Sequence, residues 1–176
     1  MFTQDKTNEE LQEMVRALAW NDAFGCYTRG GFEKIIWPEI AERARWIIYF
    51  DLDNIHYLNE INHGYEAVDA MVHRAFGSLR WTDYVASQFK SGDEFLVCLV
   101  ESDQRSAFSG QQSSDQREKI DPNAVAERLI DALMREGLTA TFAIVPVTST
   151  NLLKNVKPAI DQVFALKKSR PGGGER

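Results

Sequence analysis

The sequence has few cysteines and no long apolar run. Its two cysteines, Cys26 and Cys98, stand far apart and match no metal-ligand spacing, which favours reduced thiols in or near the core of a cytosolic protein. No apolar stretch approaches the ~20 residues needed to span a bilayer, and the N-terminus lacks the apolar segment of a signal peptide. We therefore expect a soluble, cytoplasmic protein without a membrane span.

Positive charge is also in deficit. The net charge is −6 and the pI is near 5.1, which argues against a protein that coats nucleic acid, because binding to a phosphate backbone requires clustered lysines and arginines. Small anionic ligands remain open, since one metal ion and a few cationic side chains suffice to bind them. With 176 residues, 44% of them hydrophobic, the chain suits one well-packed domain and is too short for two.

What the sequence does contain is an acidic hairpin tip. Residues 91–95 read Ser-Gly-Asp-Glu-Phe and lie between the apolar runs 84–89 and 95–100. A small residue followed by glycine suits a tight turn. The consecutive carboxylates Asp93 and Glu94 repel each other, and a hard cation would relieve that repulsion.

A second acidic segment follows a strand that the sequence predicts to be buried. Residues 47–50 are Ile-Ile-Tyr-Phe, and Asp51 and Asp53 come directly after them. Carboxylates at a strand end and on a nearby hairpin are the arrangement that binds Mg²⁺ over nucleotide phosphates. The alternative is that Asp51 and Asp53 are a solvated pair at a helix N-terminus.

The rest of the chain divides into helices and strands. A capping box at Thr7 and Glu10 predicts an N-terminal helix or linker over 1–20. Asp121 followed by Pro122 predicts the start of a later helix. The predicted elements are a turn over 21–31, helices over 32–44 (kinked or offset at Pro38), 54–82 (interrupted near 62–64), 121–136 and 151–168, strands over 45–51 and 138–147, a hairpin over 84–100, a mobile polar insertion over 101–120 and a flexible tail over 171–176.

This order of elements predicts one domain over 21–170 with an α+β fold. Hairpins flanked by helical crossovers indicate an α/β sandwich of the ferredoxin-like, palm type. We expect a central mixed or antiparallel five-stranded sheet flanked by helices.

Four fragments, in the correct order and spacing, carry a family resemblance. Residues 21–32 are similar to D-x-L-T-G-L-x-N-R-R-x-F, and residues 51–60 to D-x-D-x-F-K-x-I-N-D. Residues 91–95 match the motif G-G-D-E-F with Ser91 in place of the first glycine, and residues 160–168 resemble a closing A-D-x-A-L-Y-x-A-K. Over about residues 21–168 the chain resembles the GGDEF domain of diguanylate cyclases, which share the palm fold with nucleotide cyclases and polymerases.

The resemblance implies a site for GTP with Mg²⁺ or Mn²⁺. Metal ions that bridge phosphate oxygens polarise the α-phosphate and neutralise the leaving pyrophosphate. The backbone N–H groups at the start of the helix after the first strand would cradle phosphate. The resemblance implies that Asp51, Leu52 and Asp93 hold the metal. It implies that Asp93, Glu94 and Lys168 act in catalysis, with Glu94 helping to deprotonate the 3′-hydroxyl and Lys168 reaching the phosphates. The implied substrate-binding residues are Asn54, Ile55, Asn59, Asp69, Ser91 and Gly92.

The reading of guanine depends on the register of one segment. An Asn amide and an Asp carboxylate together match the O6 acceptor and the N1–H and N2–H donors of guanine. Asn59 stands at the expected spacing from Asp51, but the next stretch is one residue longer than N-D-x-x-G-H-x-x-G-D. If the extra residue is absorbed in the turn around His63, Asp69 is the acceptor; otherwise Val68 occupies that position.

A further motif concerns product binding. Arg80 and Asp83 match the family's R-x-x-D, which binds the cyclic dinucleotide product, and a guanidinium and a carboxylate can pair with guanine edges. The alternative is an ordinary surface pair at the end of a helix.

Three functions therefore remain open from the sequence. The first is a diguanylate cyclase that condenses two GTP into cyclic di-GMP with release of pyrophosphate, Mg²⁺-dependent, as a homodimer. The second is a non-catalytic module that binds GTP or cyclic di-GMP as a sensor. The third is a related palm cyclase that uses another nucleotide.

Overall fold

The computed structural model describes residues 7–87, 92–101 and 120–170. Ser91 at the hairpin tip, residues 102–119 of the predicted insertion and the predicted tail over 171–176 lie outside the described residues. Among the described helices none is long and apolar enough to cross a membrane.

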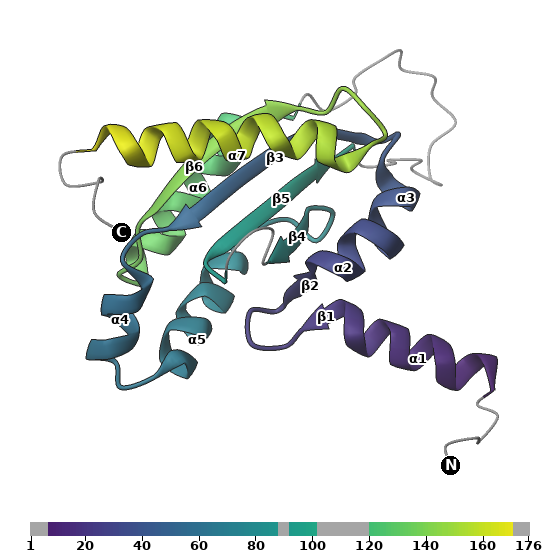
Figure 1. The fold of residues 1–176 in the computed structure, drawn as a ribbon, viewed down its shortest axis with the longest axis horizontal. Coiled ribbons are helices and arrows are strands. Elements are labelled where there is room, and N and C mark those ends of the chain that lie inside the picture. Colours follow the sequence, from purple (N-terminus) through teal and green to yellow (C-terminus); the bar gives the residue numbers. More distant parts are fainter. Residues whose placement is uncertain (1–6, 88–91, 102–119, 171–176) are drawn as a thin grey trace, which may run out of the picture.

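A mixed sheet of six strands lies at the centre of the fold, in the order β1-β2-β4-β5-β3-β6 (Figure 1). The long strands β3 (Ala44–Leu52), β5 (Glu94–Val100) and β6 (Ala140–Pro146) pair antiparallel, as does β4 (Tyr84–Ser87) with β5. Only β2 (Cys26–Thr28) and β4 run parallel among the described pairs. The predicted α+β class and palm-type fold are confirmed.

The sheet has one strand more than the five we expected. The segment over 21–31, expected as a turn, contributes β2, and β1 (Trp20–Asn21) pairs with it. Two- and three-residue strands carry too little alternation to be recognised in sequence, because their extended form depends on the neighbouring strand.

The helices begin where the capping residues predict. Thr7 and Glu10 form both bonds of a capping box at α1 (Asn8–Ala19). Asp121 caps α6 (Pro122–Arg135) through two backbone N–H groups, and Asn151 does the same for α7 (Leu152–Ser169). The remaining helices are α2 (Arg29–Gly31), the π-helical turn η1 (Phe32–Ile36), α3 (Trp37–Ile40), α4 (Ile55–Ile61) and α5 (Tyr65–Phe76).

Both faces of the sheet are covered, which explains the continuous apolar run of β3. Alternate residues of β3 point to opposite faces: Ile48 and Phe50 pack in a cluster with α5 and α6, and Ile47 and Tyr49 in a cluster with η1, α3 and α7. Figure 1 shows α7 (yellow) along one face and α6 on the other. The end of α7 therefore lies over the end of β3.

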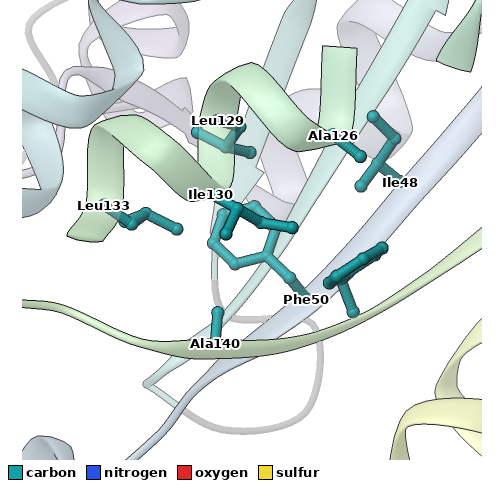
Figure 2. A pocket seen from close by; sticks show the side chains of 8 residues that line it. Ile48, Phe50, Ala126, Leu129, Ile130, Leu133 and Ala140 are labelled. Atoms are coloured by element: carbon teal, nitrogen blue, oxygen red, sulfur yellow. The ribbon is translucent and has the colours of Figure 1, made fainter. Parts of the chain in front are cut away.

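A hollow under α6 is lined only by apolar side chains, among them Phe50, Leu129 and Ala140 (Figure 2). These residues belong to the core cluster between α6 and the sheet. A lining without polar groups offers nothing to orient a nucleotide. The acidic end of β3 is therefore the better candidate for the predicted nucleotide site.

Candidate functional site

The two acidic segments meet at one end of the sheet. Asp51 on β3 lies directly opposite Glu94, the first residue of β5. A backbone hydrogen bond joins the neighbouring residues, because the Leu52 N–H donates to the carbonyl of Asp93 at 3.0 Å. We call this end of the sheet, formed by residues 51–53 and 93–94, the acidic corner. Strand end and hairpin tip are thus brought together by the β3–β5 register, in the arrangement that the sequence predicts.

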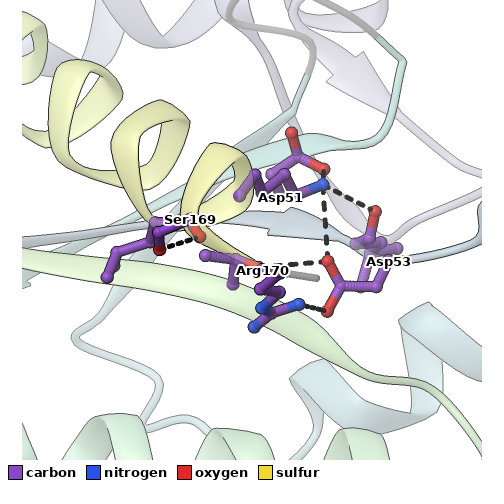
Figure 3. Close-up of polar contacts among 8 residues, drawn as sticks. Asp51, Asp53, Ser169 and Arg170 are labelled. Atoms are coloured by element: carbon purple, nitrogen blue, oxygen red, sulfur yellow. Dashed lines mark hydrogen bonds and ion pairs between the residues drawn. The ribbon is translucent and has the colours of Figure 1, made fainter. Parts of the chain in front are cut away.

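Two cationic side chains from the end of α7 reach this corner (Figure 3). The Lys167 ammonium contacts the Asp51 carboxylate, lies 3.5 Å from Asp53 Oδ1 and is 3.4 Å from the Leu52 carbonyl oxygen. Arg170 pairs with the other oxygen of Asp53 at 2.8 Å. Thr141 of β6 donates to Asp53 Oδ1 at 3.1 Å, so Asp53 is held from both sides.

Lys168, which the resemblance assigns to this site, lies elsewhere. Its ammonium is 4.5 Å from the centre of the Phe164 ring, on a helix face where Phe164 is half exposed. Lys167 is the residue at the acids. The phase of α7 explains the correction, because Lys167 and Arg170 follow the buried Val163 by four and seven residues and continue its sheet-facing stripe. That periodicity is visible in the sequence and would have found Lys167.

The electrostatics of the corner favour an added cation. Burial raises the pKa of Asp51, with Lys167 acting in the opposite direction and Asp93 and Glu94 adding to the rise. Burial also raises the pKa of the Tyr49 hydroxyl, and the neighbouring Glu94 carboxylate is the next cause. Negative charge is therefore concentrated at this end of the sheet, where Lys167 and Arg170 offset part of it.

The donor set fits Mg²⁺ or Mn²⁺. The residues predicted to hold the metal, Asp51, Leu52 and Asp93, lie together here with Glu94 beside them, and could offer oxygen ligands from two adjoining strands. No group of three His, Cys, Asp or Glu side chains with metal-holding geometry occurs in the described part of the chain. Magnesium sites over nucleotides need only one or two protein carboxylates, because phosphates and waters complete the octahedron.

The predicted base-reading residues lie on α4 and α5. The side-chain oxygen of Asn59 is buried and accepts no hydrogen bond from the described residues, which is costly unless a ligand donor satisfies it. Val68 is 1% exposed and packs in the core, whereas Asp69 is half-buried and its pKa is raised by burial and, less, by Glu66. The structure thus favours Asp69 over Val68 as the second reader.

The turn between these helices accommodates the extra residue. His63 has a φ of 57°, in the left-handed region, and α5 starts at Tyr65 after Gly64. Before α4, Asn54 is also left-handed, with a φ of 57°, and its side chain makes no capping hydrogen bond. Ile55 is the first residue of α4, and the phosphate cradle there stays a prediction.

At the hairpin tip, Gly92 is exposed, and a Cβ built on it would meet no other atom within 4 Å. Packing against the described residues therefore does not require glycine at this position. Space beside the backbone is what a bound nucleotide would need there.

The R-x-x-D pair is closed on itself. Arg80 Nη2 lies 2.9 Å from Asp83 Oδ1, and Arg80 Nε and the Arg80 backbone N–H both donate to Oδ2 at 3.2 Å. The Asp83 side chain is fully buried. Trp81 between them is 94% exposed. The pair stabilises the turn before β4, and its predicted binding of product stays a prediction.

Comparison with known proteins identifies the fold. No family model and no curated protein matches the sequence. Among solved structures, the diguanylate cyclase SiaD of Pseudomonas aeruginosa, in complex with its activator SiaC, superposes with a TM-score of 0.62 at 18% identity, over 92% of this chain and 65% of that one. The coiled coil and GGDEF domain of Caulobacter crescentus DgcB, in complex with c-di-GMP, gives 0.62 at 13% identity over 91% and 86%. The fold is that of a GGDEF domain.

A larger protein contains the same fold. The S helix-GGDEF-EAL part of Vibrio cholerae LapD, bound to c-di-GMP, gives a TM-score of 0.63 at 18% identity, over 93% of this chain and 37% of that one. The chain thus spans less than two thirds of the SiaD and LapD chains. The GGDEF fold is shared while nearly all of the sequence differs, so the function has to be argued from the site.

Proposed function

We propose that this chain is a diguanylate cyclase domain that condenses two GTP into cyclic di-GMP with release of two pyrophosphates. The observation that carries the proposal is the placement of Asp51 opposite Glu94, with the Leu52 carbonyl between two strand ends. The SiaD and DgcB likenesses support it, because SiaD is a diguanylate cyclase and the DgcB structure holds a GGDEF domain, both with the same fold as this chain.

The chain's own residues divide the work between phosphate and base. Lys167 and Arg170 are the cations nearest the acids among the described residues and would neutralise phosphate oxygens. Asn59 and Asp69 would hold the guanine edge. Glu94 would accept the proton of the attacking 3′-hydroxyl. Bound Mg²⁺ would supply charge neutralisation at the α-phosphate and the leaving pyrophosphate.

The product requires two such sites. Each half of cyclic di-GMP arises when the 3′-hydroxyl of one GTP attacks the α-phosphate of the other. One site on one chain holds one GTP, so two chains must face each other, and the cyclase acts as a homodimer.

One observation favours a second candidate, a non-catalytic module that binds cyclic di-GMP or GTP. Lys167 already compensates Asp51, so the acids are satisfied without metal chemistry. LapD and DgcB were both bound to c-di-GMP, which fits binding as well as synthesis.

Incubation of the chain with each nucleoside triphosphate and Mg²⁺, followed by mass spectrometry of products, tests the proposal. We expect cyclic di-GMP from GTP alone and none from an Asp51→Asn variant. Micromolar binding of cyclic di-GMP without turnover would favour the module, and an adenine-containing product would favour another palm cyclase.

A further inference from the structure

The contacts of the Lys167 ammonium coincide with the oxygens assigned to the metal. It touches the Asp51 carboxylate and lies 3.4 Å from the Leu52 carbonyl. These are the ligands that β3 would offer to Mg²⁺ in the proposed function, on which this inference rests. A divalent ion on the Asp51 oxygen that Lys167 contacts would lie close to the ammonium, and this arrangement is disfavoured because like charges repel strongly at contact distance.

We infer that Lys167 is an internal counter-cation that competes with the divalent metal for Asp51 and the Leu52 carbonyl. In the metal-free chain it balances a carboxylate that is only 16% exposed. When a metal ion enters, the ammonium has to leave this position. Lys167 is in the last turn of α7 and its side chain is 30% exposed, so a rotamer change suffices without unwinding the helix.

The displaced ammonium has a defined destination. A metal arriving with a nucleotide brings phosphate oxygens to the same corner, and these replace the carboxylate as partners of Lys167. When metal binds without a nucleotide, the displaced Lys167 ammonium gains no phosphate oxygen as a new partner. Metal and nucleotide therefore assist each other's binding, as thermodynamic linkage requires of two ligands that favour one state.

The chain offers two matched controls. Lys168 is the next residue and carries the same charge, but it lies over Phe164. Arg170 is a cation inside the same corner, but it pairs with Asp53 and not with Asp51. Lys167→Met, Lys168→Met and Arg170→Met each remove one positive charge. Lys167 and Arg170 both contact Asp53, and contact with Asp51 and the Leu52 carbonyl distinguishes Lys167 from both controls.

The test is the affinity of the nucleotide-free protein for Mn²⁺, measured from the free-ion electron paramagnetic resonance signal. Lys167→Met is expected to bind Mn²⁺ about 5–100-fold tighter than the unmodified chain, the usual range of a coupling between two ligands. Lys168→Met and Arg170→Met are expected to change affinity much less. The difference persists at about 0.5 M KCl, where long-range electrostatic effects are screened.

Equal effects of the three substitutions would overturn the inference and leave the cation site standing. Absence of Mn²⁺ binding in every variant would overturn the cation site as well. If Lys167→Met does not fold, lysine Cε–Hε NMR signals of the unmodified chain give the same answer: Mg²⁺ shifts the Lys167 signal, and a Lys167 signal unmoved at saturating Mg²⁺ refutes the competition.

Discussion

Asp51 and Glu94 face each other across the β3–β5 pair, two carboxylates directly opposite on adjoining antiparallel strands. Like charges in this position destabilise a sheet by themselves. Lys167 offsets the charge from one side. The proposed function places a divalent cation beside this pair.

Glu94→Gln tests that pair in catalysis. Loss of the proposed proton acceptor beside the proposed metal should lower the rate of cyclic di-GMP formation by at least about 100-fold. The rate is measured by chromatography of the products, and circular dichroism checks the fold. Glu136→Gln, a carboxylate paired with Arg74 between α5 and α6, is the control and should keep its activity. Equal losses in both variants would contradict the assignment.

Asn59→Ala separates a ligand-binding residue from a structural one. Because Asn59 Oδ1 is buried and accepts nothing from the described residues, its loss should not lower stability, while GTP affinity should fall by about 10-fold. Asn62→Ala is the control, since its amide donates to the Leu58 carbonyl at 2.8 Å. The control should lower the melting temperature and keep GTP affinity; the reverse pattern would refute the role of Asn59.

Arg80→Ala tests the closed pair before β4. The buried Asp83 carboxylate loses the guanidinium and keeps only the backbone N–H of residue 80, so the free energy of unfolding in urea should fall by about 2 kcal/mol. Arg45→Ala breaks the more exposed Arg45–Glu101 pair, 2.7 Å apart, and should cost less than about 1 kcal/mol. Calorimetry on the same variants decides whether Arg80 also binds cyclic di-GMP: a lower affinity in Arg80→Ala alone would support that prediction.

The two thiols should be unreactive in the folded chain. Burial raises the pKa of Cys26 from its ordinary value of 9.0 to about 12, and burial raises that of Cys98 too. At pH 8 the Cys26 thiolate, and hence alkylation by iodoacetamide, should be reduced about 1,000-fold relative to the unfolded chain. Between pH 9 and pH 12 the folded state holds the proton that the unfolded state releases, so stability falls as pH rises through this window. Rapid native alkylation of Cys26 would contradict its buried position.

The long elements could be predicted because local chemistry specifies them. Asp121 followed by Pro122 marks the start of α6, and the break between α4 and α5 follows from Asn62 and Gly64. The short strands β1 and β2 could not, since their conformation depends on pairing with each other and with β4.

The meeting of Asp51 with the hairpin acids could be predicted from their spacing, but the contact of Lys167 with Asp51 was not. The spacing of the family motif predicts Lys168 at the acidic residues. The helical periodicity of α7 instead places Lys167 there, because it follows the buried Val163 by four residues. In the same way burial separates Asp69 from Val68, although the two adjoin in sequence. One residue on a helix rotates a side chain by about 100°, a difference that motif spacing alone does not register.

The most direct test of the central claim is the stoichiometry of products from GTP and Mg²⁺ with the purified chain at high concentration, which favours the proposed homodimer. The account predicts one cyclic di-GMP and two pyrophosphates for each two GTP consumed. GTP recovered unchanged, under conditions in which Mn²⁺ and GTP both bind, would contradict it.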